Sequence, residues 1–315
     1  MKTHVMRSRP FSAIIAFLLF VISATLTTLS VAATVDEALI VQSPPALALS
    51  RVRESLLTRM ANSPFKIPLL IESRQSSNVI KGDVYAEIEH PFATVSAALG
   101  SPQVWCDILI LHLNTKSCVL QKGLSGAPES PTLMMTVGKK LEQMADVSVP
   151  IALIWKASQR KADFLQVNLS AESGPLSTRN YRILLEAIPT ENGNTFIHFS
   201  YEYGFGTTAK FLMKAYLSTI GRNKVGFTVT GKQSNGDPVY IEGLLGLIER
   251  NTMRHHLAVE AYLGALRVPP AMQFEKRISD WFAATDLYPV QLHEIERQQY
   301  FDMKRIQHRQ QQALH

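Results

Sequence analysis

Residues 241–266 read IEGLLGLIERNTMRHHLAVEAYLGAL, the longest stretch beyond the N-terminus with the period of an α-helix. We predict that it forms the central helix, with a broad apolar face and an opposite polar face that carries Glu249 and His256. Two polar residues, Asn251 and His255, interrupt the apolar face. They are four residues apart and therefore lie one turn above each other. This pair is the strongest local indication of a functional site.

The first 33 residues have the three parts of a secretory signal peptide. Basic residues at positions 2, 7 and 9 precede an uncharged apolar run at 11–29, and the small residues Ser-Val-Ala-Ala follow at 30–33. This order favours cleavage of residues 1–33 and export to the periplasm or the exterior of a bacterial cell. The alternative is an uncleaved N-terminal membrane anchor, because the apolar run approaches the length of a bilayer span.

The composition is typical of a folded protein. The 315 residues are 46% hydrophobic and 18% charged, so the chain can bury a sizeable core. Residues 1–33 carry three basic and no acidic residues, so their removal lowers the formal charge from +6 to +3. Such a small excess, without clustered Lys and Arg in a groove-reading motif, argues against nucleic acid as a partner.

Cys106 and Cys118 are the only cysteines of the chain, and both lie in the part predicted to be exported. In an oxidising compartment, a lone pair this close in sequence favours a disulfide over a metal site, which would need further ligands at matching spacing. The remaining alternative is two unrelated buried thiols.

The order of predicted elements divides the exported part into three segments. A leader at 34–64 contains one short helix, the main domain spans 65–267, and Pro269 and Pro270 end the central helix at the start of a helical tail at 268–315. The last helix of the tail is rich in Gln, Glu and Arg, which indicates a solvated or partner-binding helix.

The main domain reads as strands, two short helices and then a strand meander. Strands are predicted at 67–72 and 79–88, short helices at 92–108, and a strand pair at 109–113 and 118–121. Further short strands between 133 and 203 are separated by turn residues. A helix at 207–220 and a strand at 224–230 precede the central helix.

This order resembles the START-like superfamily, also called SRPBCC or Bet v 1-like. The stretch GDVYAEIEHPFATVSAALGSPQVWCDI at 82–108, the strands from 181 to 203 and the helix at 243–266 carry the resemblance. It implies an α+β helix-grip fold, in which a curved antiparallel β-sheet surrounds one long C-terminal helix, here with extra terminal helices. It also implies an apolar cavity that relatives use for lipids and other hydrophobic ligands. No catalytic motif comes with the resemblance.

Several side chains are candidates for contact with a ligand in such a cavity. Asn251 and His255 would face it and could orient the polar end of a ligand, with the strand residues Phe199, Tyr201 and Tyr203 opposite. The plainer interpretation is that Asn251 and His255 bond to backbone carbonyls, to each other or to buried water. Tyrosines at such positions also commonly fill a core with the hydroxyl at its edge.

Arg250 and Arg254 lie one turn apart on the flank of the central helix. They could bind a carboxylate or phosphate, whereas pairing with an acidic residue such as Glu186 or Glu202 is the plainer expectation. HExxH, P-loop, nucleotide-binding glycine and CxxC motifs are missing from the sequence, so we expect neither a metal nor a cofactor.

Three functions fit these patterns. The first is binding of a hydrophobic or amphipathic, lipid-like molecule in the bacterial envelope, driven by apolar burial. The second is a cyclase-like or hydrolase-like enzyme in the same cavity, with His255 as general acid or base. The third is an envelope protein whose residues 290–315 recognise a protein partner or a membrane surface.

Overall fold

The computed structural model describes residues 42–313, apart from 66, 122–129, 139–147 and 219–223. The predicted signal peptide at residues 1–33 lies outside the described residues. All that follows concerns the unit Gln42–His315. In its described part, every helix is too short or too polar to cross a membrane.

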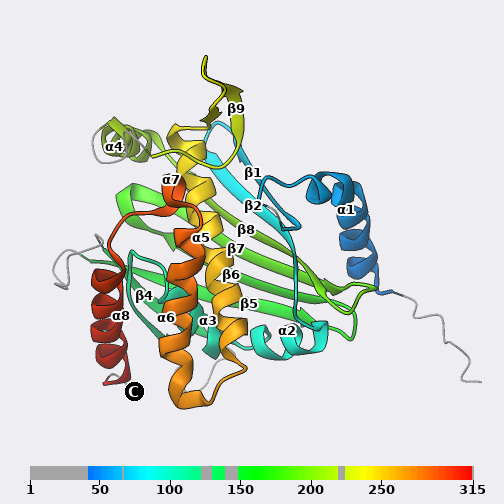
Figure 1. The fold of residues 1–315 in the computed structure, drawn as a ribbon. Coiled ribbons are helices and arrows are strands. Elements are labelled where there is room, and N and C mark those ends of the chain that lie inside the picture. Colours follow the sequence, from blue (N-terminus) through cyan, green and yellow to red (C-terminus); the bar gives the residue numbers. More distant parts are fainter. Residues whose placement is uncertain (1–41, 66, 122–129, 139–147, 219–223, 314–315) are drawn as a thin grey trace, which may run out of the picture. The chain divides into compact units, whose positions relative to one another are not determined.

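The described residues of this unit form an eight-stranded antiparallel sheet in the order β1-β2-β8-β7-β6-β5-β4-β3 (Figure 1). From β3 to β8, each strand pairs with the next along the chain, and β2 closes the meander by pairing with β8. The strands are β1 Leu69–Gln75, β2 Val79–Ile88, β3 Thr115–Gln121, β4 Thr132–Val137, β5 Val149–Arg160, β6 Leu165–Ser173, β7 Thr178–Pro189 and β8 Thr195–Phe205.

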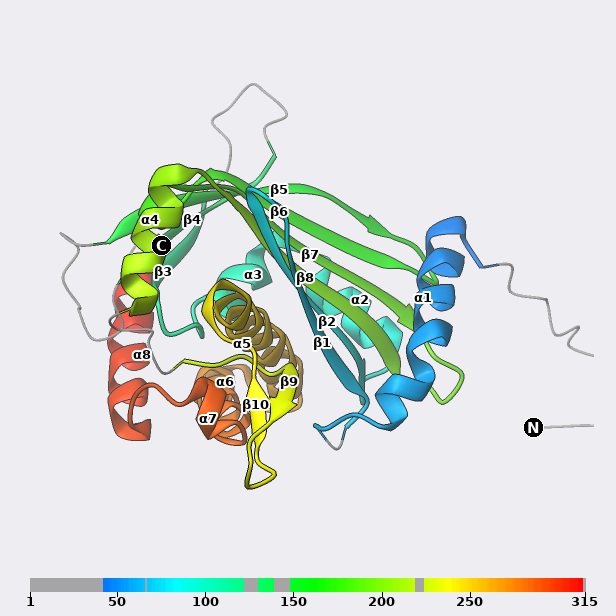
Figure 2. The same cartoon turned by 90° about the horizontal axis from the view of Figure 1, so that it is seen from above.

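The helices are arranged on both faces of this sheet, as Figure 2 shows. Helix α5 packs against one face, here called the inner face, and α1 packs against the outer face. The helices are α1 Pro44–Ala61, α2 Phe92–Leu99, α3 Pro102–Leu109, α4 Thr207–Ser218, α5 Gly243–Ala265, α6 Pro270–Asp286, α7 Pro289–Leu292 and α8 Arg297–Gln312. This is the predicted α+β helix-grip architecture, with β1 added at the edge of the sheet.

Alternation along the strands separates two apolar clusters. On β8, Ile197 and Phe199 belong to the main core beneath α5, whereas Phe196 belongs to the cluster that α1 covers. The space between α5 and the inner face of the sheet is called the grip below. The predicted leader helix is therefore confirmed as a surface helix, and it covers part of the outer face.

Helix α5 differs from the prediction in one respect, because the face turned away from the sheet is also buried. Glu249 and His256, which we expected on a solvated face, are both 0% exposed. The tail covers part of this face, since α6 lies along α5 on the side away from the sheet (Figure 1), whereas Glu249 is enclosed by residues 226–228 and by β1. Glu249 accepts hydrogen bonds from Phe227 N, from the backbone and hydroxyl of Thr228, and from the Ser73 hydroxyl.

The prediction of a solvated last helix is also wrong, because one face of α8 belongs to the core. Tyr300 and Lys304 are 0% exposed, and the Tyr300 ring stacks on Trp281 of α6 at 4.9 Å between centroids. The long polar side chains are buried because their ends find partners, as when Gln311 accepts a hydrogen bond from Cys118 N at 3.0 Å.

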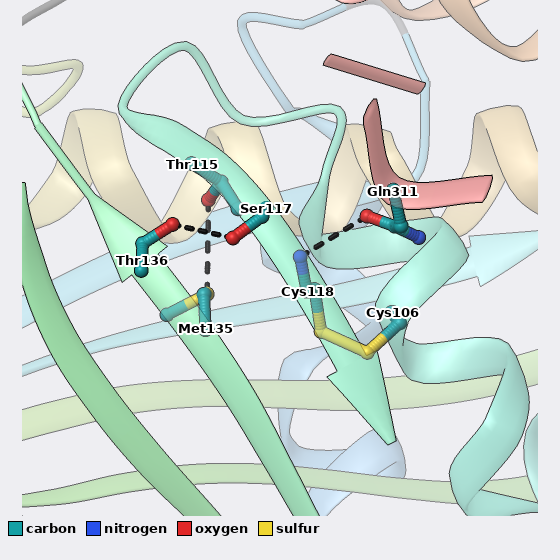
Figure 3. The surroundings of a disulfide bond; sticks show 7 residues. All are labelled: Cys106, Thr115, Ser117, Cys118, Met135, Thr136 and Gln311. Atoms are coloured by element: carbon teal, nitrogen blue, oxygen red, sulfur yellow. Dashed lines mark hydrogen bonds between the residues drawn. A yellow bond between two sulfur atoms is a disulfide. The ribbon is translucent and has the colours of Figure 1, made fainter. Parts of the chain in front are cut away.

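The disulfide between Cys106 and Cys118 is confirmed, and it joins α3 to β3 (Figure 3). The predicted strand at 109–113 is wrong, because α3 continues to Leu109 and a turn leads into β3. The predicted strand at 224–230 is reduced to β9 Val229–Lys232, which pairs with β10 Pro238–Tyr240 in a separate hairpin.

Candidate functional site

Two histidines stack face to face inside the grip. His255 of α5 and His112, in the turn between α3 and β3, have ring centroids 4.9 Å apart and planes inclined by 22°. His255 also contacts Tyr201 and Phe199 of β8, at 5.2 and 6.1 Å between ring centroids. We call His112 and His255 the histidine stack. It places two polar rings against an aromatic strand surface.

Both rings are held in the neutral form. Burial penalises the charged imidazolium and lowers the pKa of His255 to about 4, with the charge of Arg254 acting in the same direction. Burial also lowers the pKa of His112 well below its ordinary value, and the neighbouring His255, Arg254 and Lys304 lower it further. The Asn251 side chain, one turn before His255, opposes this shift. At neutral pH the stack therefore has no net charge.

The tautomer of His112 follows from its backbone contact. The Asn114 backbone N–H donates to His112 Nδ1 at 3.2 Å, so the ring proton resides on Nε2. Within the described part of the chain, His255 Nδ1 is buried without a hydrogen-bond partner, whereas His112 is approached by Asn114 N and by the Asn251 side chain. The stack thus presents one unused ring nitrogen in an apolar environment.

The other predicted residues of the β8 surface divide into two groups. Tyr201 and Phe199 reach His255, and Tyr201 keeps partial exposure although it lies on the inner face. Tyr203 instead packs on Tyr181 and towards α4, with its hydroxyl 4.0 Å from Met213 Sδ. Asn251 is half-buried, and its influence on His112 places it beside the stack.

Both arginines make buried contacts from α5, Arg254 with the tail and Arg250 with the segment that precedes α5. Arg254 Nη2 lies 2.5 Å from Glu294 Oε1 and donates to the Leu292 carbonyl, so its guanidinium is held by protein groups. Arg250 is 1% exposed and donates to the Val225 carbonyl. The predicted pairing of these arginines with Glu186 or Glu202 is wrong, because both glutamates lie on the outer face. There Glu186 pairs with His198 and Glu202 pairs with Arg182.

Sequence reasoning missed His112 and Lys304. Lys304 is fully buried, and its ammonium donates to the carbonyls of His112 and Thr115 and to Gln307 Oε1. It thereby holds the turn that carries His112. His112 falls in the stretch that was predicted as a strand, and a lone histidine there gives no signal that it meets a residue 143 positions later.

One small cavity lies beside the stack rather than in it. Its volume is about 10 Å³, and Trp281, Phe282, Leu292 and Glu294 are among the residues that line it. Such a volume accommodates one water molecule at most. Among the described residues, no group of three or more His, Cys, Asp or Glu side chains could hold a metal ion.

A second buried histidine lies on the outer face of the sheet. His198 Nε2 is 2.8 Å from Asp83 Oδ1, and its Nδ1 is 3.0 Å from Glu186 Oε2. Burial disfavours the charged ring, but the two carboxylates more than offset this effect and raise the pKa of His198. Tyr85 stacks on the ring at 4.6 Å between centroids. Because both of its nitrogens and one face of its ring are engaged, His198 is a structural residue of the sheet, and its raised pKa favours the charged form.

Comparisons with known proteins give the fold a context but no site. No protein-family model and no curated protein matches the chain. Among solved structures, it is similar to a norcoclaurine synthase point mutant from Thalictrum flavum in complex with a transition-state analogue. The sequence identity is 13% and the TM-score is 0.33, and the match covers 47% of this chain and 90% of the synthase. It is also similar to human StAR-related lipid transfer protein 5, with 10% identity, a TM-score of 0.29, and coverage of 55% and 89%. At these values, the fold assignment rests on the strand order described above.

Proposed function

We propose that the chain binds a hydrophobic or amphipathic small molecule in the grip, with the polar end of the ligand at the histidine stack. The observation that carries this proposal is the buried ring nitrogen His255 Nδ1, which has no hydrogen-bond partner among the described residues. A buried polar group without a partner costs about 1 to 3 kcal/mol, and a ligand group that supplies the partner recovers that cost.

The surroundings of the stack support an apolar body for this ligand. Phe199 and Tyr201 line one side of His255, and the strand positions around them on the inner face are apolar. Burial of such a ligand would contribute roughly 25 cal/mol per Å² of apolar surface. The cavity beside the stack is too small for such a ligand, so we expect side chains to move on binding, and the half-buried Tyr201 and Asn251 are the first candidates.

The electrostatics favour binding over acid–base catalysis at this site. A histidine with a pKa of about 4 is a weak base, so His255 would accept a proton poorly at neutral pH. Neutral imidazoles instead suit hydrogen bonding to a carbonyl, hydroxyl or carboxylate group. The enzymatic alternative therefore has less support than the binding one.

Residence in the periplasm or outside the cell is part of the proposal. The Cys106–Cys118 disulfide is of a kind that persists in oxidising compartments, in agreement with the predicted signal peptide. A membrane-surface or protein partner of residues 290–315 would be limited to the exposed face of α8, since the other face packs in the core.

Native mass spectrometry of the chain purified from the exported fraction tests the proposal. We expect a co-purified small molecule that is lost in His255→Phe and kept in His256→Phe. The second variant is a matched control, because His256 is the next residue of α5, is fully buried and also has ring nitrogens without a hydrogen-bond partner, but is not part of the stack. A wild-type chain that carries no ligand from any lipid extract would contradict the proposal, as would equal loss in both variants.

A further inference from the structure

The outer side of α4 combines exposed apolar and basic side chains. Phe211 is 72% exposed, and Leu212 beside it is 36% exposed. Lys210 and Lys214 flank these two residues and are exposed as well. The twelve residues of the helix include no Asp or Glu. We call Lys210, Phe211, Leu212 and Lys214 the α4 surface.

The opposite side of α4 explains why this surface points outward. Ala209 and Met213, at i and i+4, are 0% and 2% exposed and pack in a cluster with Tyr203, Phe205 and Ile80. The helix is therefore anchored on the sheet by its small inner face. Helix α4 also contacts α5, near the amino-terminal end of α5 in Figure 1.

A neighbouring segment extends the exposed apolar area. The short 3-10 turn Pro175–Ser177 contacts α4, and its Leu176 is 47% exposed. Leu176 has a φ of 55°, a conformation that is unfavourable for a residue with a side chain. An apolar side chain held at the surface in this way adds to the area beside Phe211.

We infer that the α4 surface docks on an anionic lipid bilayer. An interfacial helix binds by inserting apolar side chains between the headgroups while its lysines approach the negative lipids. Phe211 and Leu212 supply the first part, and Lys210 and Lys214, which make no ion pair within the described residues, supply the second. The inference does not depend on the ligand proposed for the grip.

The most exposed large apolar side chain among the described residues lacks this combination. Leu287, at the end of α6, is 74% exposed, but its neighbour Asp286 is an exposed acid. An acidic neighbour is repelled by an anionic surface, so Leu287 provides a control that matches Phe211 in exposure and differs in charge.

Tryptophan quenching by brominated phosphatidylglycerol in vesicles tests the inference at the level of single positions. In the full chain, we expect bromine to quench Phe211→Trp and to leave Leu287→Trp unaffected. This readout separates α4 from the apolar run at residues 11–29, which could bind vesicles by itself. Equal quenching at the two positions, or none at Phe211→Trp, would overturn the inference.

Lysine substitutions test the electrostatic part with vesicles of phosphatidylcholine and phosphatidylglycerol in equal parts. We expect quenching of Phe211→Trp to need about fivefold more lipid after Lys210→Gln, and about 30-fold more after Lys210→Gln with Lys214→Gln. Lys161→Gln, an exposed control in the β5–β6 turn, should change nothing. If the double variant binds like its parent, or if pure phosphatidylcholine binds equally well, the inference is wrong.

Discussion

His255 and His112 lie face to face in the core, 4.9 Å apart at their ring centroids, and Nδ1 of His255 lacks a hydrogen-bond partner among the described residues. Cores rarely keep such groups, because each costs free energy that an apolar ring would not. The stack therefore reduces the stability of the chain, which is common where a side chain is retained for binding.

The first prediction concerns the stability cost of His255. His255→Phe keeps an aromatic ring on His112 and removes the unpartnered nitrogen, so we expect the free energy of unfolding at pH 7 to rise by about 1 kcal/mol. Urea denaturation measures this change. A loss of stability would show that the nitrogen is satisfied in solution.

The same residue gives a pH dependence whose sign is fixed by its lowered pKa. In the unfolded chain, the His255 imidazole binds a proton near pH 6.5, whereas in the folded chain it is protonated only at about pH 4. As the pH falls from 6.5 to 4, the free energy of unfolding should therefore decrease because of His255. The decrease is on the order of 3 kcal/mol and is complete below pH 4. His255→Phe should flatten this part of the profile, and an unchanged slope would count against the assignment.

A second prediction concerns His198 and Asp83 on the outer face. Asp83 is 1% exposed and lies 2.8 Å from His198 Nε2 and 2.9 Å from Lys81 Nζ, so Asp83→Asn leaves buried cations underpaired. We expect a loss of roughly 3 kcal/mol in the free energy of unfolding. Glu202→Gln, which removes a surface pair with Arg182, should cost under about 1 kcal/mol. An equal loss of stability in Asp83→Asn and Glu202→Gln would contradict the larger contribution that we expect from the buried network.

The pH range of this network follows from three shifts. Burial opposes charge on each group, but mutual hydrogen bonds raise the pKa of His198 and lower those of Asp83 and Glu186. The contribution of His198 to the free energy of unfolding is complete below pH 6.5. It is lost as the pH rises through the pKa that His198 has in the folded chain. The carboxylate contributions are complete above pH 4.5 and are lost as the pH falls through their folded values. The stability difference between wild type and His198→Gln should therefore be largest between pH 4.5 and 6.5.

The third prediction concerns the closest approach of α5 to the sheet. A Cβ at Gly82 of β2 would overlap Thr252 Oγ1 and lie 3.1 Å from Thr252 Cβ. We expect Gly82→Ala to lower the free energy of unfolding by about 2 kcal/mol, and Thr252→Ala in the same chain to recover part of it. Gly231→Ala is the control, because nothing lies within 4 Å of the added atom.

The fourth prediction concerns the disulfide. Cys106 and Cys118 are 12 residues apart, so their replacement by serine should cost on the order of 3 kcal/mol. A reducing agent should destabilise the wild type and leave the double serine variant unchanged. Gln311→Ala, which removes the hydrogen bond to Cys118 N, should cost about 1 kcal/mol with the disulfide intact.

Much of the fold could be predicted because local signals agreed with it. Alternation on β2 and β8 and the period of α5 both follow from backbone geometry. The disulfide could also be predicted, because two cysteines close in sequence in an oxidising compartment usually pair with each other.

The partners of α5 could not be predicted, because they come from distant segments. Nothing around Glu294 indicates that it meets Arg254, and the Gln-rich composition of α8 conceals that Tyr300 and Lys304 are buried. Periodicity reports which face of a helix is apolar, but it does not report that a tail covers the other face. For the same reason, His255 was found from the sequence whereas its stacking partner His112 was not.

A titration with dansyl-labelled undecanoic acid, followed by its fluorescence, tests the central claim most directly. Tyr201 contacts the histidine stack, whereas Tyr203, on the same strand face, contacts Met213 instead. We expect saturable binding by the wild type, about fivefold weaker binding by Tyr201→Phe from the loss of one hydroxyl, and no change in Tyr203→Phe. The absence of saturable binding, or equal effects of the two substitutions, would contradict a ligand site at His255.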